Sequence, residues 1–131
     1  MTNPVPRDAV ALAADVRDGT LDPTEVLEQA ISRIEELDPQ LNAMVATRFD
    51  EARTEVAAGL PDGPMRGVPI VIKSLGTDVA GLPTADGSRL FADTVATVDS
   101  AIVQRYKAAG MIVLGTTNVP EMGKTTTTES L

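Results

Sequence analysis

Cysteine and histidine are both absent from the 131 residues of this chain. Without cysteine, the chain can form no disulfide, no thiolate nucleophile and no cysteine-ligated metal site. Without histidine, a catalytic triad built on imidazole is excluded, and the commonest metal ligand of proteins is missing. Any general base in this sequence must therefore be a lysine, an aspartate, a glutamate or the single tyrosine.

Aromatic residues and positive charge are also scarce. Tryptophan is absent, and two phenylalanines and one tyrosine leave a core that must consist of aliphatic residues and methionine. The net charge of −8 argues against binding to nucleic acid or to an anionic membrane surface. No apolar run has the length of a membrane span, and no signal peptide is recognisable, so we expect a soluble cytoplasmic protein.

The amino-terminal part of the chain carries the periodicity of helices. Apolar residues spaced along residues 8–18 predict a short amphipathic helix. A second helix is predicted over residues 23–37, with Asp22 as its cap and Glu25 at the capping-box position. Pro39 is expected to end this helix, because proline disfavours helical geometry at the residue before it.

A strand and a third helix are expected next. Residues 41–47 predict a strand, and residues 49–58 predict a helix that a glycine closes. The apolar residues that alternate along this strand are Leu41, Ala43 and Val45. Residues 61–67 are rich in proline and glycine and predict a linker between this helical leader and the rest of the chain.

Two further apolar runs, with a helix between them, follow the linker. Strands are predicted over residues 68–72 and 111–114, and Asp99 is expected to cap a helix that continues to Ala109. The residues expected to face inward from this helix are Ile102, Val103 and Tyr106. Apolar strands without polar alternation, separated by a helix, indicate a parallel βαβ unit that is buried on both faces. Two parallel strands leave unpaired edges, so the fold is expected to be incomplete within these residues.

Lys73 ends the first of these apolar runs and precedes a long loop. Burying a lysine is costly unless the lysine is paired or neutral. A desolvated lysine loses its proton more readily and can act as a base near neutral pH. Lys73 is therefore the candidate catalytic residue, and a strand-end lysine that reaches solvent is the alternative.

Motifs on both sides of Lys73 occur in a characteristic order. They are GPMRGVPIVIKS at residues 63–74, GLPTADGS at residues 81–88 and AAGMIVLGTTNVPEMG at residues 108–123. In order and spacing these motifs resemble the amino-terminal part of the amidase signature family, and the resemblance covers essentially the whole chain.

The resemblance implies an amidase that converts a carboxylic amide to an acid and an amine through a Ser-cisSer-Lys triad. Lys73 occupies the position of the lysine, which acts as a neutral base through a bridging serine; no metal and no organic cofactor is implied. Neither the bridging serine nor the motif of the nucleophile is present in residues 1–131; the serines that do not match them are Ser74, Ser88, Ser100 and Ser130. The isolated chain is therefore expected to be inactive.

Departures from the family pattern leave the subfamily open. They are Ser74 in place of the usual aspartate, Thr84-Ala85 in place of Thr-Thr, and Thr116 in place of the lysine of Gly-Lys-Thr-Asn. Residues 118–123 are more similar to stand-alone amidases than to the A subunit of a tRNA-dependent amidotransferase, which is the first alternative. The second alternative is an inactive fragment that serves only as a structural or interaction piece.

The fold class that follows is α/β, with amino-terminal helices followed by a βαβ unit of a larger mixed sheet. Residues 1–131 are expected to be the amino-terminal part of a single amidase domain, with residues 1–60 as a helical leader and residues 61–131 as the start of the α/β core. The expected partners are a small-molecule amide and either a second copy of the chain or the missing carboxy-terminal part.

The segments around Lys73 are expected to be ordered. A loop as long as residues 74–98 is usually functional or disordered, and we expect it to be ordered near the site. Asn118 and Glu121 are expected to hold loop structure by hydrogen bonds rather than to act chemically. The threonine run at residues 125–128 is expected to be polar connecting chain, and the lining of a substrate entrance is the alternative.

Overall fold

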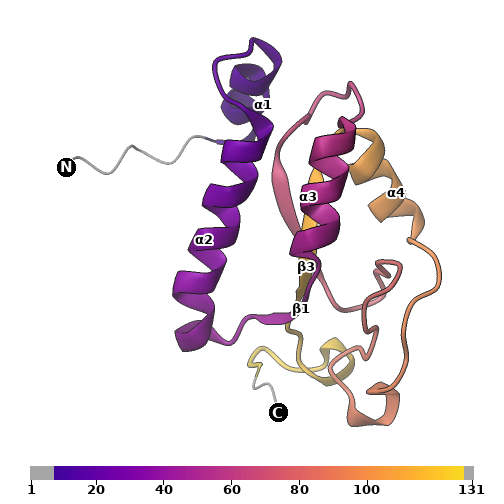
Figure 1. Ribbon diagram of the computed structural model, residues 1–131. Coiled ribbons are helices and arrows are strands. Elements are labelled where there is room, and N and C mark those ends of the chain that lie inside the picture. Colours follow the sequence, from indigo (N-terminus) through magenta and orange to yellow (C-terminus); the bar gives the residue numbers. More distant parts are fainter. Residues whose placement is uncertain (1–7, 129–131) are drawn as a thin grey trace.

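Residues 8–128 are described by the computed structural model, which has a mixed three-stranded sheet with helices on both sides (Figure 1). The helices are α1 (Ala9–Arg17), α2 (Pro23–Leu41), α3 (Phe49–Ala58) and α4 (Ala101–Ala108). The strands are β1 (Met44–Thr47), β2 (Pro69–Lys73) and β3 (Ile112–Thr117), and two short 3-10 turns are η1 (Arg89–Phe91) and η2 (Glu121–Gly123). This architecture confirms the predicted α/β class.

The sheet has the strand order β1-β3-β2, and β3 lies in its centre. β2 and β3 are parallel and are connected through α4, which confirms the predicted βαβ unit. β1 pairs with the other edge of β3 in the antiparallel sense. Within the described residues β2 has no partner on its outer side, so the sheet keeps an open edge there.

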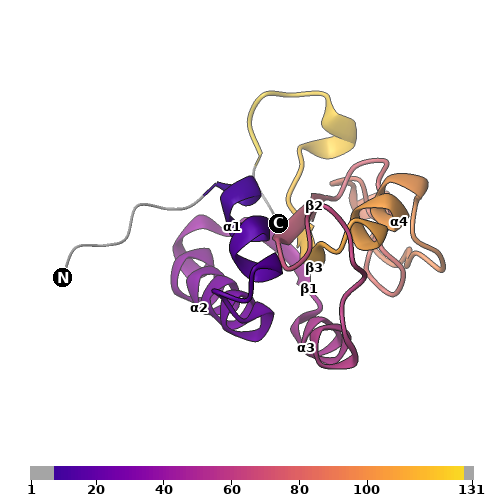
Figure 2. The ribbon, with the colours of Figure 1, turned by 90° about the horizontal axis from the view of Figure 1, so that it is seen from above.

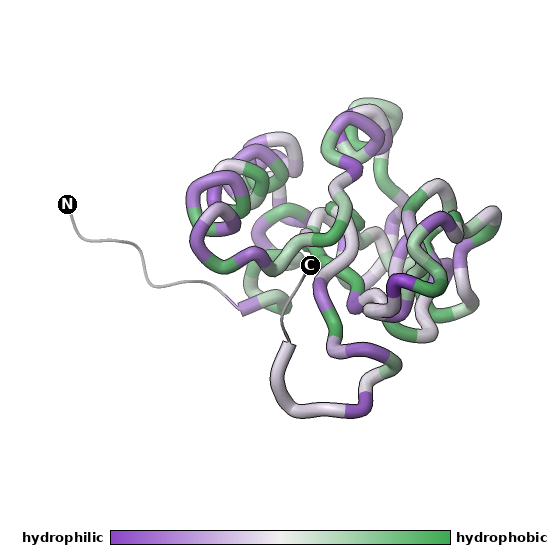
Figure 3. The backbone as a smooth tube through the Cα atoms, turned by 90° about the horizontal axis from the view of Figure 1, so that it is seen from below, coloured by the Kyte–Doolittle hydropathy of each residue, from purple (hydrophilic) through white to green (hydrophobic). Residues whose placement is uncertain are grey.

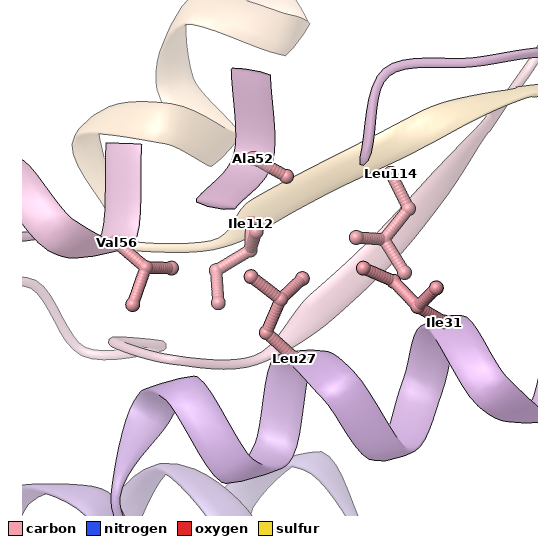
Figure 4. Packing of buried hydrophobic residues seen from close by; sticks show 6 residues of the cluster. All are labelled: Leu27, Ile31, Ala52, Val56, Ile112 and Leu114. Atoms are coloured by element: carbon pink, nitrogen blue, oxygen red, sulfur yellow. The ribbon is translucent and has the colours of Figure 1, made fainter. Parts of the chain in front are cut away.

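Two hydrophobic clusters pack against opposite faces of β3, because successive side chains of a strand point to opposite faces. On one face α2 and α3 cover the sheet (Figure 4), and this cluster consists of Leu27, Ile31, Ala52, Val56, Ile112 and Leu114. On the other face α4 and the loop after β2 contribute the second cluster, which consists of Ile72, Val79, Leu82, Val103 and Val113. Seen from above, α1 and α2 lie on one side of the strands and α4 lies on the other (Figure 2).

Local signals in the sequence fix where the helices begin. The side chain of Asp22 accepts a hydrogen bond of 2.7 Å from the backbone N–H of Thr24, and Glu25 lies in the first turn of α2. Asp8 caps α1 in the same way, with a bond of 2.8 Å from Ala11 N–H. Hydrophilic and hydrophobic residues alternate around the helices (Figure 3), as expected for amphipathic helices with one buried side.

The predicted end of the second helix at residue 37 is wrong, because α2 continues through Pro39 to Leu41. Pro39 lies in the last turn, and it removes the one backbone hydrogen bond that its N–H would have donated to the carbonyl of Glu35. The carboxylate of Asp38 compensates by accepting bonds of 2.7 and 2.9 Å from the N–H groups of Ala43 and Met44. Asn42 then ends the helix in the left-handed conformation, with φ of 50°.

This longer helix changes which face of β1 is buried. The strand begins at Met44, and Met44 and Ala46 are its half-buried residues. Two of the residues expected on the inner face, Leu41 and Val45, are 65% and 44% exposed. The predicted alternation is therefore wrong by one residue, which moves every side chain of a strand to the opposite face.

Arg48 connects the start of α3 to β3. This side chain is only 8% exposed, and it donates to the carbonyl of Val113 at 2.9 Å and to the carboxylate of Glu55. Burial disfavours the charged form of Arg48. The hydrogen bond to Glu55 and the negative charges of the nearby carboxylates together outweigh this effect and hold the pKa of Arg48 above its ordinary value. This pair was not predicted from the sequence, because its partners lie seven residues apart along the chain.

Asp99 does not cap the helix that follows it, contrary to the prediction. The cap position of α4 is Ser100, and its side chain makes no capping bond. The carboxylate of Asp99 instead accepts hydrogen bonds of 2.8 Å from Ala80 N–H and 2.7 Å from Lys107 Nζ. Asp99 therefore joins the loop after β2 to the last turn of α4. Of the residues predicted to face inward from this helix, Val103 is buried and Tyr106 is half-buried, whereas Ile102 is exposed.

Candidate active site

Lys73 is the last residue of β2 and lies beside Thr117, the last residue of β3. The backbone N–H of Ser74 donates a bond of 3.0 Å to the carbonyl of Thr117, which extends the pairing one residue further. In open α/β sheets ligands bind outside the carboxyl ends of parallel strands. The lysine predicted as the site residue therefore lies at the edge of the sheet where a site is expected.

The side chain of Lys73 is exposed, so the described residues do not provide the burial expected of a neutral lysine. Alternation along β2 explains this exposure, because Ile72 points into the second cluster and Val71 and Lys73 point to the other face. Val71 is itself 39% exposed on the open edge strand. Within residues 8–128 that face is uncovered next to Lys73.

The loop of residues 74–98 is ordered, as predicted. Val79 and Leu82 are buried in the second cluster, and Pro83 pairs with Val95 across the loop. Backbone bonds of 2.8 and 3.0 Å between residues 81 and 96 and between residues 96 and 82 close the loop on itself. The loop therefore returns to the carboxyl edge of the sheet as a folded unit, and it lies beside the segment after β3 (Figure 1).

The folded loop is joined to the segment after β3 by two hydrogen bonds. The buried hydroxyl of Ser88 donates to Glu121 Oε1 at 2.8 Å, and the N–H of Met122 donates to the carbonyl of Asp86 at 2.9 Å. The carboxylate of Asp86 also accepts a bond of 3.0 Å from the N–H of Gly76, just after the end of β2. We call residues 86–88 and 120–123, with these contacts, the loop clamp.

The backbone of the loop clamp is strained on both sides. Asp86 and Met122 have φ of 49° and 51°, in the left-handed region that residues other than glycine rarely adopt. Gly87 has φ of 70°, and a Cβ atom there would lie 2.4 Å from the carbonyl oxygen of Val119. Such strain persists where the surrounding structure imposes it, and it is concentrated at functional sites.

An open groove with a volume of about 620 Å³ lies along the loop clamp. Its lining residues are Gly87, Ser88, Arg89, Leu90, Pro120, Glu121, Thr125 and Thr127. The guanidinium of Arg89 and the carboxylate of Glu121 give this groove groups of both charges. The predicted role of the threonine run as connecting chain is thus incomplete, because two of its residues line the groove.

Asn118 holds the amino-terminal side of the same segment to the residues just before β1. Its N–H donates to the carbonyl of Ala43 at 2.7 Å, and its side-chain oxygen accepts from the N–H of Val119 at 2.9 Å. Asn118 and Glu121 therefore make the structural hydrogen bonds that the sequence predicted. Asp86, by contrast, was not identified from the sequence, although an aspartate before a glycine is a usual turn signal.

Within residues 8–128 there is no group of three histidine, cysteine, aspartate or glutamate side chains that could hold a metal ion. Over the same residues, no helix combines the length and the apolar character that crossing a bilayer requires.

The comparisons with known proteins agree on one family. The family model described as Amidase matches residues 25–131. An acylamidase of Rhodococcus erythropolis is 38% identical over 122 residues, which are 88% of this chain and 25% of that protein. The A subunit of a glutamyl-tRNA(Gln) amidotransferase of Oleidesulfovibrio alaskensis is also 38% identical over 122 residues, 89% of this chain and 25% of that protein.

The fold is shared with solved structures of the same kind. The structure of a 6-aminohexanoate cyclic dimer hydrolase in complex with its substrate superposes with a TM-score of 0.86 at 37% identity. The superposition covers 94% of this chain and 26% of that chain. The chain therefore spans about a quarter of the length of the relatives that it matches.

Proposed function

Because this chain belongs to the amidase family, we propose that it forms the amino-terminal part of an enzyme that hydrolyses a carboxylic amide. The products would be a carboxylic acid and an amine. The observation that carries the proposal is the position of Lys73, at the carboxyl end of β2 and beside the end of β3. The ordered loop and the segment after β3 surround this edge of the sheet.

In this proposal Lys73 is the base of a Ser-cisSer-Lys triad. A serine hydroxyl is a weak nucleophile until a neighbouring base accepts its proton. A lysine accepts a proton only when it is neutral, which requires desolvation. Since Lys73 is exposed within the described residues, the groups that desolvate it would come from other parts of the enzyme. The two serines and the oxyanion donors would come from there as well.

A small-molecule amide is the proposed substrate. The acylamidase relative and the cyclic dimer hydrolase are named for amide bonds in small molecules. The net charge of −8 disfavours a nucleic-acid substrate. We also propose a cytoplasmic location for this enzyme.

The alternative within the same family is the A subunit of a tRNA-dependent amidotransferase. The identity of 38% to such a subunit supports this alternative as strongly as the identity to the acylamidase supports the first. The two differ in their need for partner subunits. Amide hydrolysis by the purified full-length protein alone would favour the stand-alone amidase.

The first experiment combines the intact mass of the protein with one substitution. A mass near 13.7 kDa would identify a protein of these residues alone, for which we expect no amide hydrolysis. A mass several times larger would identify a full-length amidase. In that enzyme, Lys73→Ala is expected to reduce kcat/KM at least about 100-fold, since general base catalysis contributes roughly 10²–10⁴.

Lys124→Ala is the matched control, because Lys124 is also exposed and lies beyond the loop clamp. It is expected to leave kcat/KM unchanged. A Lys73→Ala enzyme with unaltered activity would contradict the role of Lys73. Hydrolysis by the pure 131-residue chain, lost on Lys73→Ala, would contradict the expected dependence on further residues.

A further inference from the structure

We propose that Glu121 is a positioning residue, which holds the segment after Lys73 in place through the hydroxyl of Ser88. This inference rests on the proposed role of Lys73 as the base. It concerns residues that lie beside the base and do not touch the reacting atoms.

The hydrogen bond between Ser88 and Glu121 joins the two halves of the loop clamp. Ser88 is 7% exposed, and its hydroxyl accepts a bond of 3.3 Å from the N–H of Leu90. Because this N–H occupies a lone pair of the oxygen, the hydroxyl proton is available for Glu121 Oε1 at 2.8 Å. Glu121 thus holds a buried hydroxyl that comes from a segment 33 residues away in the sequence.

Further contacts connect the segment of Ser88 to the end of β2. Asp86, two residues before Ser88, accepts the N–H of Gly76 with its carboxylate and the N–H of Met122 with its carbonyl. Leu75 packs against the other side of the clamp, where its Cδ2 lies 2.7 Å from the position of a Cβ atom built on Gly123. Leu75 and Gly76 are therefore held by both halves of the loop clamp, directly after Lys73 and Ser74.

The backbone of the loop clamp is strained in both of its halves. The left-handed residues Asp86 and Met122 are hydrogen-bonded to each other, and each is followed by a left-handed glycine. A backbone of this kind relaxes unless other contacts fix it. The hydrogen bond between the side chains of Ser88 and Glu121 connects the same two segments, so it is the contact suited to hold their backbones in this conformation.

Removing Glu121 is expected to slow the chemical step and to leave substrate binding unchanged. A base that is displaced by about 1 Å can lose roughly 100-fold in rate, because proton transfer needs a defined geometry. Removing Glu121 would free residues 75 and 76 and thereby the end of β2. The charge of Glu121 is not required by this mechanism; only an acceptor for the Ser88 hydroxyl is required.

The test compares Glu121→Ala, Glu121→Gln and Ser88→Ala in the full-length protein. Glu121→Ala and Ser88→Ala are each expected to lower kcat about 10- to 100-fold with KM changed less than about 2-fold. Glu121→Gln is expected to keep kcat near that of the unmodified protein, because the amide oxygen of glutamine can accept the same hydrogen bond. The double variant is expected to be no worse than either single variant, since both remove one contact.

Amide hydrogen exchange supplies a second readout that does not depend on activity. The N–H groups of Gly76 and Met122 are expected to exchange faster in Glu121→Ala than in the unmodified protein. In Glu121→Gln they are expected to exchange at the rates of the unmodified protein. Glu36→Ala is the control, because Glu36 pairs with Arg33 on the exposed side of α2. It is expected to change neither kcat nor these exchange rates.

The outcomes separate this inference from the proposed function. If Lys73→Ala abolishes turnover and Glu121→Ala leaves kcat unchanged, the positioning role is wrong and the proposed function stands. If Glu121→Gln is as damaging as Glu121→Ala, Glu121 acts through its charge and the inference is overturned. If the full-length protein hydrolyses no amide, the proposed function fails. In that case the hydrogen exchange of the Gly76 N–H still tests the role of Glu121. An unchanged exchange rate in Glu121→Ala would overturn the inference.

Discussion

Gly87 shows how a single residue fixes the crossing of two segments. At this position the loop after β2 passes so close to the segment after β3 that a side chain has no room, since a Cβ atom would lie 2.4 Å from the carbonyl oxygen of Val119. Gly19 has a similar φ of 75°, but a Cβ atom there would meet no other heavy atom within 4 Å. The two glycines therefore separate the effect of conformation from the effect of contact.

Gly87→Ala is expected to lower the free energy of unfolding by about 2–4 kcal/mol. About 1–2 kcal/mol comes from the left-handed conformation, and the remainder comes from the displaced backbone of Val119. Gly19→Ala is expected to cost only the conformational part. Urea unfolding of the three proteins measures both losses, and equal losses at the two positions would contradict the close approach.

Asp99 acts at the scale of whole elements, because it connects the loop after β2 to α4. Burial raises the pKa of Asp99, but the hydrogen bonds from Lys107 and from Ala80 N–H outweigh it and hold this pKa below its ordinary value of 3.8. A carboxylate whose pKa is lower in the folded state stabilises the fold above its unfolded pKa. This contribution to stability is lost as the pH falls through the pKa that Asp99 has in the folded state.

Asp99→Asn is therefore expected to lower the free energy of unfolding by about 1.5–3 kcal/mol at pH 7, the usual contribution of a hydrogen bond to a charged group. The difference from the unmodified protein is expected to narrow as the pH falls below about 4. Asp93→Asn is the control, since Asp93 is an exposed residue of the same loop. A difference that stays constant from pH 7 to pH 3 would exclude this ionised hydrogen bond.

At the scale of the whole molecule, the open outer edge of β2 is the dominant feature. Its Val71 is 39% exposed, and a mostly apolar groove of about 190 Å³ lies beside it, between the sheet and the end of α2. An exposed strand with apolar side chains is a template for pairing with another chain. The predicted association with a second copy or with further parts of the enzyme is consistent with this edge.

The 131-residue chain is accordingly expected to self-associate as its concentration rises, and Val71→Lys is expected to weaken this association. A charged residue on an edge strand opposes pairing, because pairing would place the charge against a second strand. Sedimentation velocity over a range of concentrations measures the effect. Val10→Lys is the control, since Val10 is 71% exposed on α1 and is not part of the strand. Identical association of the two variants would show that another surface is responsible.

The local elements were largely predictable because the signals for them lie within a few residues. Asp22 caps α2, the apolar runs became β2 and β3, and the helix at 49–58 has the predicted bounds. The errors arose where a distant contact competes with a local signal. Pro39 is tolerated because Asp38 bonds the residues after the helix, and the resulting shift of β1 exposes Val45.

The sequence by itself determined the family, the parallel βαβ unit and the position of Lys73, because each is encoded by neighbouring residues in a fixed order. Only the tertiary structure decided that Asp99 bonds Ala80 and Lys107 and that Ser88 bonds Glu121. It also decided that Lys73 is exposed within these residues. The physical reason is that hydrogen bonding and burial depend on which distant segments share a face of the sheet, and periodicity in the sequence does not specify this.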